Sequence, residues 1–197
     1  MILKSKYLTM KKQTLILLFI ISFFMYYPCF LPAQQTQKPS GKEVKVKWYS
    51  FEDAYKLNKK KPKKMFIDVF TEWCGWCKKM DAETFANPFI ANYMNDHFYC
   101  VKFDAERKDT IVLDGVTFVN PNPAGKRTTH QLANELLRNK MSYPSYVFLN
   151  EKGQELTVVS GYQPAKEFEG VLTYFGKDAY LKSTWEEYRS TFQGELK

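Results

Sequence analysis

The chain has 197 residues, of which 45% are hydrophobic and 25% are charged, proportions typical of a soluble globular domain. This composition excludes a collagen-like, a low-complexity and a wholly disordered protein. Four cysteines are too few for a disulfide scaffold at this length, so each cysteine is interpreted separately. One domain is the default expectation for a chain of this size.

The first 33 residues have the pattern of a secretory signal peptide. Four lysines precede an apolar run from Leu15 to Leu31, which is a charged region followed by a hydrophobic one. We expect this segment either to be cleaved after the small residue Ala33 or to remain as a membrane anchor, since about 17–25 apolar residues can span a bilayer. Lipid attachment at Cys29 is a third alternative. All three predict an exported protein, located in the periplasm or elsewhere outside the cytoplasm.

The positive charge of the chain is concentrated in this leader. Residues 1–33 hold four lysines and no acid, so the net charge of +8 falls to +4 over the remaining 164 residues. The lysine-rich segment 59–64 contains Pro62 and no aromatic residue, which is typical of a solvated turn and gives no surface for stacking on bases. We therefore expect no nucleic-acid partner, and a membrane contact only through an N-terminal anchor.

Hydrophobic periodicity and turn residues predict one α/β domain over residues 44–197, after a flexible polar leader at 34–43. The first half of the pattern predicts a short strand around Val44 and Val46, a helix capped by Ser50, a buried strand at 65–70, a helix that begins at Cys74–Cys77 and a helix from Asn87–Pro88. A strand at 98–103, a hairpin at 110–119 and a loop at 120–127 follow. The last part predicts a helix with Thr128 and Gln131 in capping-box spacing, two strands at 145–150 and 155–160, and two helices at 164–175 and 181–192. Strands and helices alternate early, and a hairpin and helix come late, which predicts an α/β sandwich.

The most informative motif is Cys74-Gly75-Trp76-Cys77, at a predicted junction between a strand and a helix. Two thiols three residues apart in the first turn of a helix can close a small disulfide ring. The unpaired N–H groups and the positive dipole end of the helix favour a thiolate at Cys74. Because the thiolate is the attacking species, Cys74 is the candidate nucleophile, and Cys77, one turn further in, is the candidate resolving thiol.

Two other interpretations of the cysteine pair remain. A structural zinc site needs about four ligands, and the further candidates are Cys100, His97 and His130, with no second paired spacing. The second interpretation is a purely structural disulfide between Cys74 and Cys77. We expect no metal, and we interpret both histidines as surface residues near helix ends and Cys100 as a buried, inert thiol.

With these residues in view, the chain resembles the thioredoxin family, in particular exported bacterial thioredoxin-like proteins with a Trp-Cys-Gly-x-Cys-Lys motif. The resemblance covers roughly residues 44–175 and includes Asp68, six residues before Cys74, where the family keeps a buried carboxylate. It also includes Tyr143-Pro144, at the place of the family's cis-proline. It implies a thioredoxin fold, a central mixed sheet flanked by helices, here with an insertion before the cis-proline and an extra C-terminal helix.

The resemblance also implies roles for individual residues. Asp68, in an apolar strand that raises the pKa of a carboxyl, would accept a proton from the resolving thiol. Tyr143 and Pro144 would bind an extended substrate through the backbone. Trp73 and Trp76 would line the same docking groove, and Gly75 would keep the turn between the cysteines tight.

Three features depart from the family pattern. Trp76 replaces the usual proline between the cysteines. The lysine that often pairs with the buried acid falls near Cys100, which predicts that Asp68 lacks this partner. The segment 105–127 is longer than in a minimal thioredoxin, and we expect it to shape a partner surface.

The sequence therefore predicts an exported thiol–disulfide oxidoreductase that reduces or isomerises protein disulfides, needs no cofactor, and receives electrons from a membrane or soluble thiol donor. The alternatives are a non-catalytic peptide-binding module with the same fold and a zinc-binding domain. The sequence fixes neither the direction of electron flow nor the client.

Overall fold

The computed structural model describes residues 44–197, so the expected signal peptide or anchor (1–33) and the leader (34–43) lie outside the described residues. The described elements, with their bounds, are β1 (Trp48–Tyr49), α2 (Phe51–Lys60), β2 (Met65–Phe70), α3 (Gly75–Lys79), the π-helical segment η1 (Met80–Phe85), α4 (Pro88–His97), β3 (Tyr99–Asp104), β4 (Ile111–Leu113), β5 (Val116–Phe118), α5 (Gln131–Leu136), β6 (Ser145–Leu149), β7 (Glu155–Ser160), α6 (Ala165–Gly176), the 3₁₀ turn η2 (Ala179–Leu181) and α7 (Trp185–Thr191).

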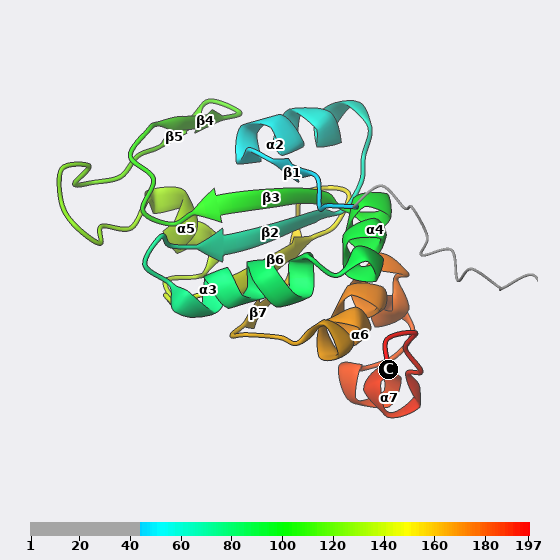
Figure 1. Cartoon of the computed structure of the whole chain (residues 1–197). Coiled ribbons are helices and arrows are strands. Elements are labelled where there is room, and N and C mark those ends of the chain that lie inside the picture. The colour runs from blue at the N-terminus through cyan, green and yellow to red at the C-terminus, as the bar shows by residue number, and fades with distance from the viewer. Residues whose placement is uncertain (1–43) are drawn as a thin grey trace, which may run out of the picture. The chain divides into compact units, whose positions relative to one another are not determined.

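A five-stranded mixed sheet forms the centre of this part of the chain, in the order β1-β3-β2-β6-β7 (Figure 1). Strand β3 runs parallel to both β1 and β2, whereas β6 runs antiparallel to both β2 and β7. Strands β4 and β5 form a separate two-stranded hairpin. The predicted central mixed sheet with flanking helices, the hairpin at 110–119 and the additional C-terminal helix are all confirmed.

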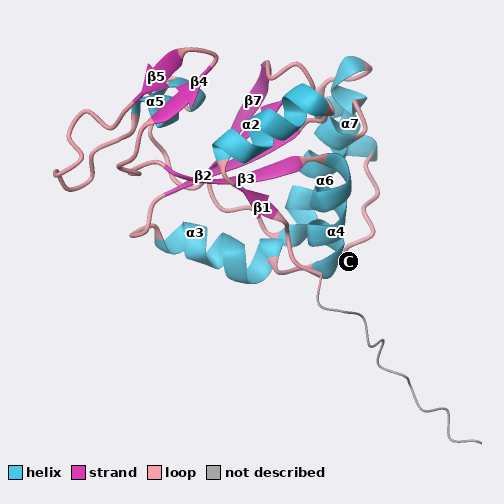
Figure 2. Ribbon diagram, turned by 90° about the horizontal axis from the view of Figure 1, so that it is seen from above, coloured by secondary structure: helices cyan, strands magenta, loops and turns pink. Residues whose placement is uncertain are grey.

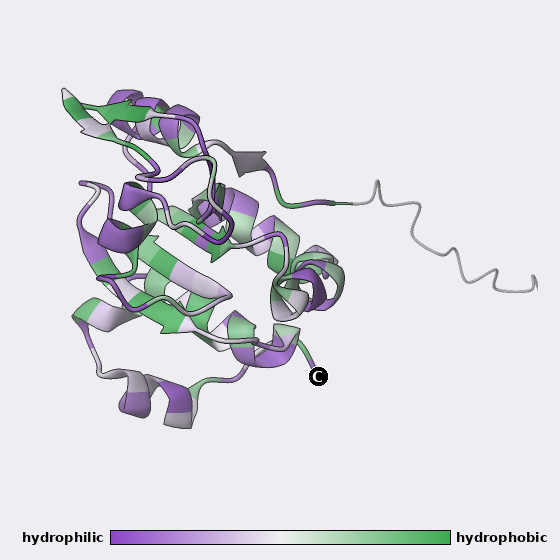
Figure 3. Cartoon of the chain, turned by 90° about the vertical axis from the view of Figure 1, so that its left-hand side faces the viewer, coloured by the Kyte–Doolittle hydropathy of each residue, from purple (hydrophilic) through white to green (hydrophobic). Residues whose placement is uncertain are grey.

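Each face of the sheet is covered by helices, because consecutive residues of a strand point to opposite faces. Phe66 of β2 belongs to a core that also includes residues of η1, α4 and α6, whereas its neighbour Ile67 belongs to a core with residues of α2 and α5. Figure 2 shows α2 and α5 on one side of the sheet and α3, α4 and α6 on the other. In Figure 3 the strands of the sheet are mostly green, which marks the apolar interior. The continuously apolar sequence of β2 follows from burial on both faces.

Local capping sets the starts of two helices where the sequence predicts them. The Ser50 hydroxyl accepts a hydrogen bond from the Asp53 N–H at 3.0 Å, and the Asn87 side chain accepts bonds from the N–H groups of Phe89 and Ile90. Pro88 follows directly as the first residue of α4, where its missing N–H removes no helical hydrogen bond. These boundaries are predictable because the capping groups lie within three residues of the helix they cap.

The first strand lies further along the chain than predicted. The Asn95 side chain accepts a hydrogen bond from the Lys47 N–H at 2.7 Å and donates one to the Lys45 carbonyl at 2.9 Å. These bonds from α4 occupy backbone groups that would otherwise join the sheet. Pairing with β3 therefore begins only at Trp48, opposite Cys100, although Val46 is buried in the core.

The predicted capping box at Thr128 is wrong, and so is the surface position of His130. Helix α5 begins at Gln131 and is capped by His130, whose Nδ1 accepts from the Leu132 N–H at 3.1 Å. His130 is fully buried, and its Nε2 lies 3.1 Å from the Asp109 carbonyl. The Thr128 hydroxyl instead donates to the Asn122 carbonyl at 2.8 Å. The cap of α5 thus depends on a residue 21 positions earlier, which no local pattern reveals. The other histidine, His97, ends α4 as expected and is half-buried.

The C-terminal part of the chain adds the predicted last helix, α7, which starts later than expected. Leu181 lies in η2, and α7 begins at Trp185 with a capping box between Thr184 and Glu187. Within residues 44–197 the structure contains no helix that is both long and apolar enough to span a membrane.

Candidate active site

Two cysteines lie where the chain leaves β2 and enters α3. Cys74 is the N-cap residue of α3, and Cys77 lies in its first turn. The two sulfurs form a disulfide, with 5.3 Å between the Cα atoms, and the Cys77 N–H donates a hydrogen bond to Cys74 Sγ at 3.0 Å. The same N–H would stabilise a thiolate at Cys74 once the disulfide opens, as would the positive end of the helix dipole.

The cysteines themselves are largely covered, and their aromatic neighbours are exposed. Cys74 is 5% exposed and Cys77 is 2% exposed, whereas Trp73 and Trp76 are 50% and 57% exposed. A Cβ atom built on Gly75 would meet no atom within 4 Å apart from its chain neighbours and the backbone of its own helix, and the backbone there is not left-handed. The expectation that Gly75 keeps the turn tight stays a prediction; what the structure shows is open space beside the Cα atom of Gly75.

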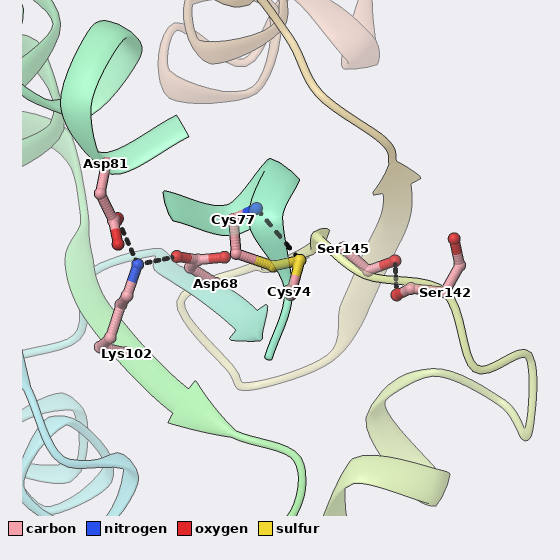
Figure 4. Close-up of a disulfide and its surroundings, with 7 residues drawn as sticks. All are labelled: Asp68, Cys74, Cys77, Asp81, Lys102, Ser142 and Ser145. Carbon is pink, nitrogen blue, oxygen red and sulfur yellow. Dashed lines mark hydrogen bonds and ion pairs between the residues drawn. A yellow bond between two sulfur atoms is a disulfide. The ribbon is translucent and has the colours of Figure 1, made fainter. Parts of the chain in front are cut away.

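A buried carboxyl group lies in β2, the strand that precedes the cysteine pair. Asp68 is 1% exposed in the middle of β2, and in Figure 4 its carboxyl group lies between the Lys102 ammonium and the side chain of Cys77. Burial raises the pKa of Asp68 to about 6, and the nearby Lys102 ammonium limits the rise. The group can therefore take up and release a proton near neutral pH.

The prediction that Asp68 lacks a lysine partner is wrong. Lys102 of β3 donates a hydrogen bond from Nζ to Asp68 Oδ2 at 2.5 Å, because parallel pairing of β2 with β3 places Asp68 opposite Lys102. The aromatic rings of Trp48, Phe70 and Phe85 surround the ammonium, with centroids 5.0 to 5.4 Å from Nζ. The signal in the sequence was a single charged residue inside the apolar stretch 98–103.

Two further residues of this region had not been predicted. The Lys102 ammonium also forms an ion pair with Asp81 of η1, whose side chain is 47% exposed. On the other side, Tyr146 of β6 pairs directly opposite Asp68. Its hydroxyl is buried without a hydrogen-bond partner among residues 44–197, as is Asp68 Oδ1. Asp68 thus faces a lysine on one side and an uncharged buried surface on the other.

The segment before β6 packs against the start of α3. The Tyr143–Pro144 peptide bond is cis, as the resemblance implied, and the Tyr143 ring contacts the Trp73 ring edge-on, with 5.9 Å between centroids. Figure 4 shows Ser142 and Ser145 on the Cys74 side of the disulfide, joined by a 2.7 Å hydrogen bond from the Ser145 hydroxyl to the Ser142 carbonyl. Within residues 44–197, the N–H and C=O of Tyr143 form no hydrogen bond to another backbone group, so this backbone is available to a ligand.

Each exposed tryptophan carries a cation on its ring. Lys79 Nζ lies 5.2 Å from the Trp76 ring centroid and 4.7 Å from that of Tyr162. The Arg127 guanidinium lies 4.9 Å from the Trp73 ring centroid. These contacts are in the range of cation–π interactions.

The third described thiol lies away from this site. Cys100 of β3 is fully buried, and burial raises its pKa to about 12, which matches the expectation of an inert thiol. Among residues 44–197 no group of three or more His, Cys, Asp or Glu side chains is arranged to hold a metal ion.

Comparison with known proteins gives the family. Residues 51–176 match the model of the thioredoxin-like domain, and the chain belongs to this family. The mouse spermatogenesis-associated protein 20 is 33% identical over 81 residues, which cover 41% of this chain and 10% of that protein. The thiol:disulfide interchange protein DsbD of Pectobacterium atrosepticum is 24% identical over 118 residues, which cover 59% of this chain and 17% of that protein.

Among solved structures, the DsbH oxidoreductase is similar in fold, with a TM-score of 0.51 and 18% sequence identity over 74% of this chain and 92% of that chain. The spermatogenesis-associated relatives are much longer proteins, and the match spans about a tenth of their length. The comparisons therefore establish the thioredoxin-like fold and family of the domain.

Proposed function

We propose that this protein is a thiol–disulfide oxidoreductase in which Cys74 is the nucleophile and Cys77 the resolving thiol. The observation that carries the proposal is the Cys74–Cys77 disulfide at the start of α3. A buried aspartate with a pKa near 6 lies in β2, and Figure 4 shows its carboxyl group toward Cys77. The thioredoxin-like family and the oxidoreductase named among its structural neighbours support it.

In the reducing direction the reaction begins with the dithiol form. The Cys74 thiolate attacks one sulfur of a substrate disulfide, forms a mixed disulfide and expels the other substrate sulfur as a thiolate, which takes up a proton. The Cys77 thiolate then attacks Cys74 Sγ, restores the Cys74–Cys77 disulfide and expels the second substrate thiolate. Two electrons pass from the cysteine pair to the substrate, and a thiol donor must return them.

Asp68 supplies the proton acceptor for the second step. Cys77 is buried, so its proton cannot pass directly to bulk water, and a carboxylate with a pKa near 6 can accept it at neutral pH. Lys102 keeps part of the Asp68 population ionised through its direct hydrogen bond.

The groove around Cys74 binds the substrate. We propose that the free backbone groups of Tyr143 pair with an extended substrate strand beside Pro144, while Trp73 and Trp76 provide exposed aromatic contact surface. The open space next to Gly75 admits the substrate backbone.

We further propose that the domain comprises residues 44–197 and that the segment 1–33 exports it from the cytoplasm. Outside the cytoplasm it would act on protein disulfides, with a membrane or soluble thiol protein as its electron donor. The sequence pattern of that segment supports export. The thiol:disulfide interchange protein among the relatives supports a partner of this kind.

Insulin reduction with dithiothreitol as electron donor tests the activity. We expect Cys74→Ser to abolish turnover, and Cys77→Ser to accumulate mixed disulfides through Cys74 that non-reducing electrophoresis resolves. Cys100→Ala, which removes the third described thiol, is the matched control and should retain activity. Unchanged insulin reduction in Cys74→Ser would disprove the assignment.

A non-catalytic peptide-binding module is the second candidate, because the exposed tryptophans and the free Tyr143 backbone would also serve simple binding. It predicts peptide binding that is unchanged in Cys74→Ser and no turnover in the wild-type protein.

A further inference from the structure

The expected insertion builds a cavity of about 380 Å³ beside the candidate active site. Its lining combines Trp73, which precedes Cys74, with Met141 and Tyr143 before the cis-proline, and with Glu106 and Arg127 from the two ends of the insertion. The cavity therefore joins three segments that are far apart in the sequence, and one of them, at Trp73, directly precedes Cys74.

Two opposite charges face this cavity without neutralising each other. Glu106 Oε1 accepts a hydrogen bond from the Trp73 indole N–H at 2.9 Å, and the Arg127 guanidinium lies over the face of the same indole. Neither residue forms an ion pair with any group in residues 44–197. The tryptophan thus holds a carboxylate at its edge and a guanidinium on its face.

This charge arrangement selects among ligands. A purely anionic ligand would be attracted by Arg127 and repelled by Glu106, and a purely cationic ligand would experience the reverse. A ligand that carries an ammonium and a carboxylate a few ångströms apart can satisfy both groups with charge-assisted hydrogen bonds. The apolar surfaces of Trp73, Met141 and Tyr143 would pack against its carbon atoms.

We propose that this cavity binds the zwitterionic amino-acid end of a small disulfide of the cystine type, and that such disulfides are a further substrate class of this protein. The inference rests on the proposed thiol–disulfide exchange at Cys74. In the mixed disulfide, the half-cystine attached to Cys74 Sγ has its ammonium and carboxylate only three bonds from its own sulfur. Its ammonium would meet Glu106 and its carboxylate Arg127.

The atoms and electrons of the net reaction balance with cystine and the protein dithiol alone. One cystine and the Cys74–Cys77 dithiol give two cysteine molecules and the Cys74–Cys77 disulfide, so the substrate S–S bond is reduced by two electrons and the protein pair is oxidised. The two protons come from the two protein thiols.

Single-turnover kinetics with four small disulfides test the proposal. The pre-reduced full chain is mixed with cystine (zwitterionic), cystamine (cationic), dithiodiglycolate (anionic) or bis(2-hydroxyethyl) disulfide (neutral), and oxidation is followed by tryptophan fluorescence. For each disulfide the rate constant of a variant is divided by that of the wild-type protein, which removes differences in the intrinsic reactivity of the four compounds.

We expect Glu106→Gln and Arg127→Gln each to lower the rate with cystine by up to about fivefold, the upper end of what an exposed charge pair contributes, and to change the rate with the neutral disulfide less than twofold. Glu106→Gln keeps the acceptor for the Trp73 indole, and Arg127→Lys should restore part of the rate because it keeps the charge. Lys126→Gln, an exposed cation next to Arg127 that does not line the cavity, is the matched control and should leave all four rates within twofold.

Equal effects on cystine and on the neutral disulfide would overturn the proposal. A lower rate with cystine in only one of the two Gln variants would also overturn the proposal, because the cavity would then recognise only one charged end of the ligand. A wild-type protein that fails to reduce even the neutral disulfide would instead contradict the proposed function itself.

Discussion

At the residue scale, the site depends on how the pKa of one buried carboxyl group, that of Asp68, is kept near the physiological range. Asp68 has lost nearly all contact with water, and its compensation is a single ammonium that it shares with the exposed Asp81. A full ion pair would hold Asp68 ionised, and no partner at all would hold it protonated. The shared lysine gives an intermediate pKa, about 6.

The first prediction concerns the stability of the folded protein as a function of pH. Because the pKa of Asp68 rises from 3.8 when unfolded to about 6 when folded, the folded state retains a proton that the unfolded chain releases. The contribution of Asp68 to stability is therefore greatest below about pH 4 and decreases as the pH rises through 6, by about 3 kcal/mol. We expect the difference in unfolding free energy, Asp68→Asn minus wild type, to increase by about this amount from pH 4 to pH 7 in urea titrations. A difference that does not change with pH would contradict it.

The second prediction concerns how Lys102 and Asp81 set the pKa of Asp68. Asp81→Asn should lower the pKa of Asp68, since a negative charge is removed and Lys102 is left to Asp68 alone. Lys102→Gln should raise it. Carboxyl carbon chemical shifts, followed by NMR across pH, measure both. The control is Glu83→Gln, which removes an exposed acid of η1 that does not contact Lys102. If Asp81→Asn and Lys102→Gln moved the pKa of Asp68 in the same direction, the prediction would be wrong.

At the scale of elements, the sequence predicts what neighbouring residues decide. Ser50 and Asn87 cap the helices that follow them directly, and Asp114-Gly115 forms the turn of its own hairpin. The start of α5 and the first strand were placed wrongly because their hydrogen bonds come from Asp109 and Asn95, distant in sequence.

The third prediction tests the cap of α5. His130 must be neutral at Nδ1 to accept the Leu132 N–H, and burial lowers its pKa. Since its folded pKa lies below the unfolded value of 6.5, its contribution to stability is present above about pH 6.5 and decreases as the pH falls below it. We expect His130→Asn, which keeps a capping acceptor but does not titrate, to lose this part of the pH dependence in thermal unfolding between pH 5 and 7.5. Identical pH profiles for variant and wild type would show that His130 does not titrate with folding.

At the scale of the whole molecule, the fold and the cysteine pair were predictable and the electrostatics around them were not. The motif Cys74-Gly75-Trp76-Cys77 together with Asp68 and Tyr143-Pro144 is enough to indicate the thioredoxin-like family, which the match over residues 51–176 establishes. Lys102 could not be assigned to Asp68, because the two residues are 34 positions apart and their pairing depends on the register of two parallel strands. The cavity between Glu106 and Arg127 likewise arises only when the insertion folds back onto Trp73.

The pKa of the Cys74 thiol in the reduced protein tests the central claim most directly. The rate of iodoacetamide alkylation at Cys74 is measured from pH 4 to pH 10, with mass spectrometry to identify the modified residue. We expect a midpoint at least one unit below the usual cysteine value of about 8.5 and fast reaction at pH 7, because the Cys77 N–H and the dipole of α3 stabilise the thiolate. A midpoint at or above 8.5, with alkylation at pH 7 no faster than that of an unperturbed cysteine, would contradict it.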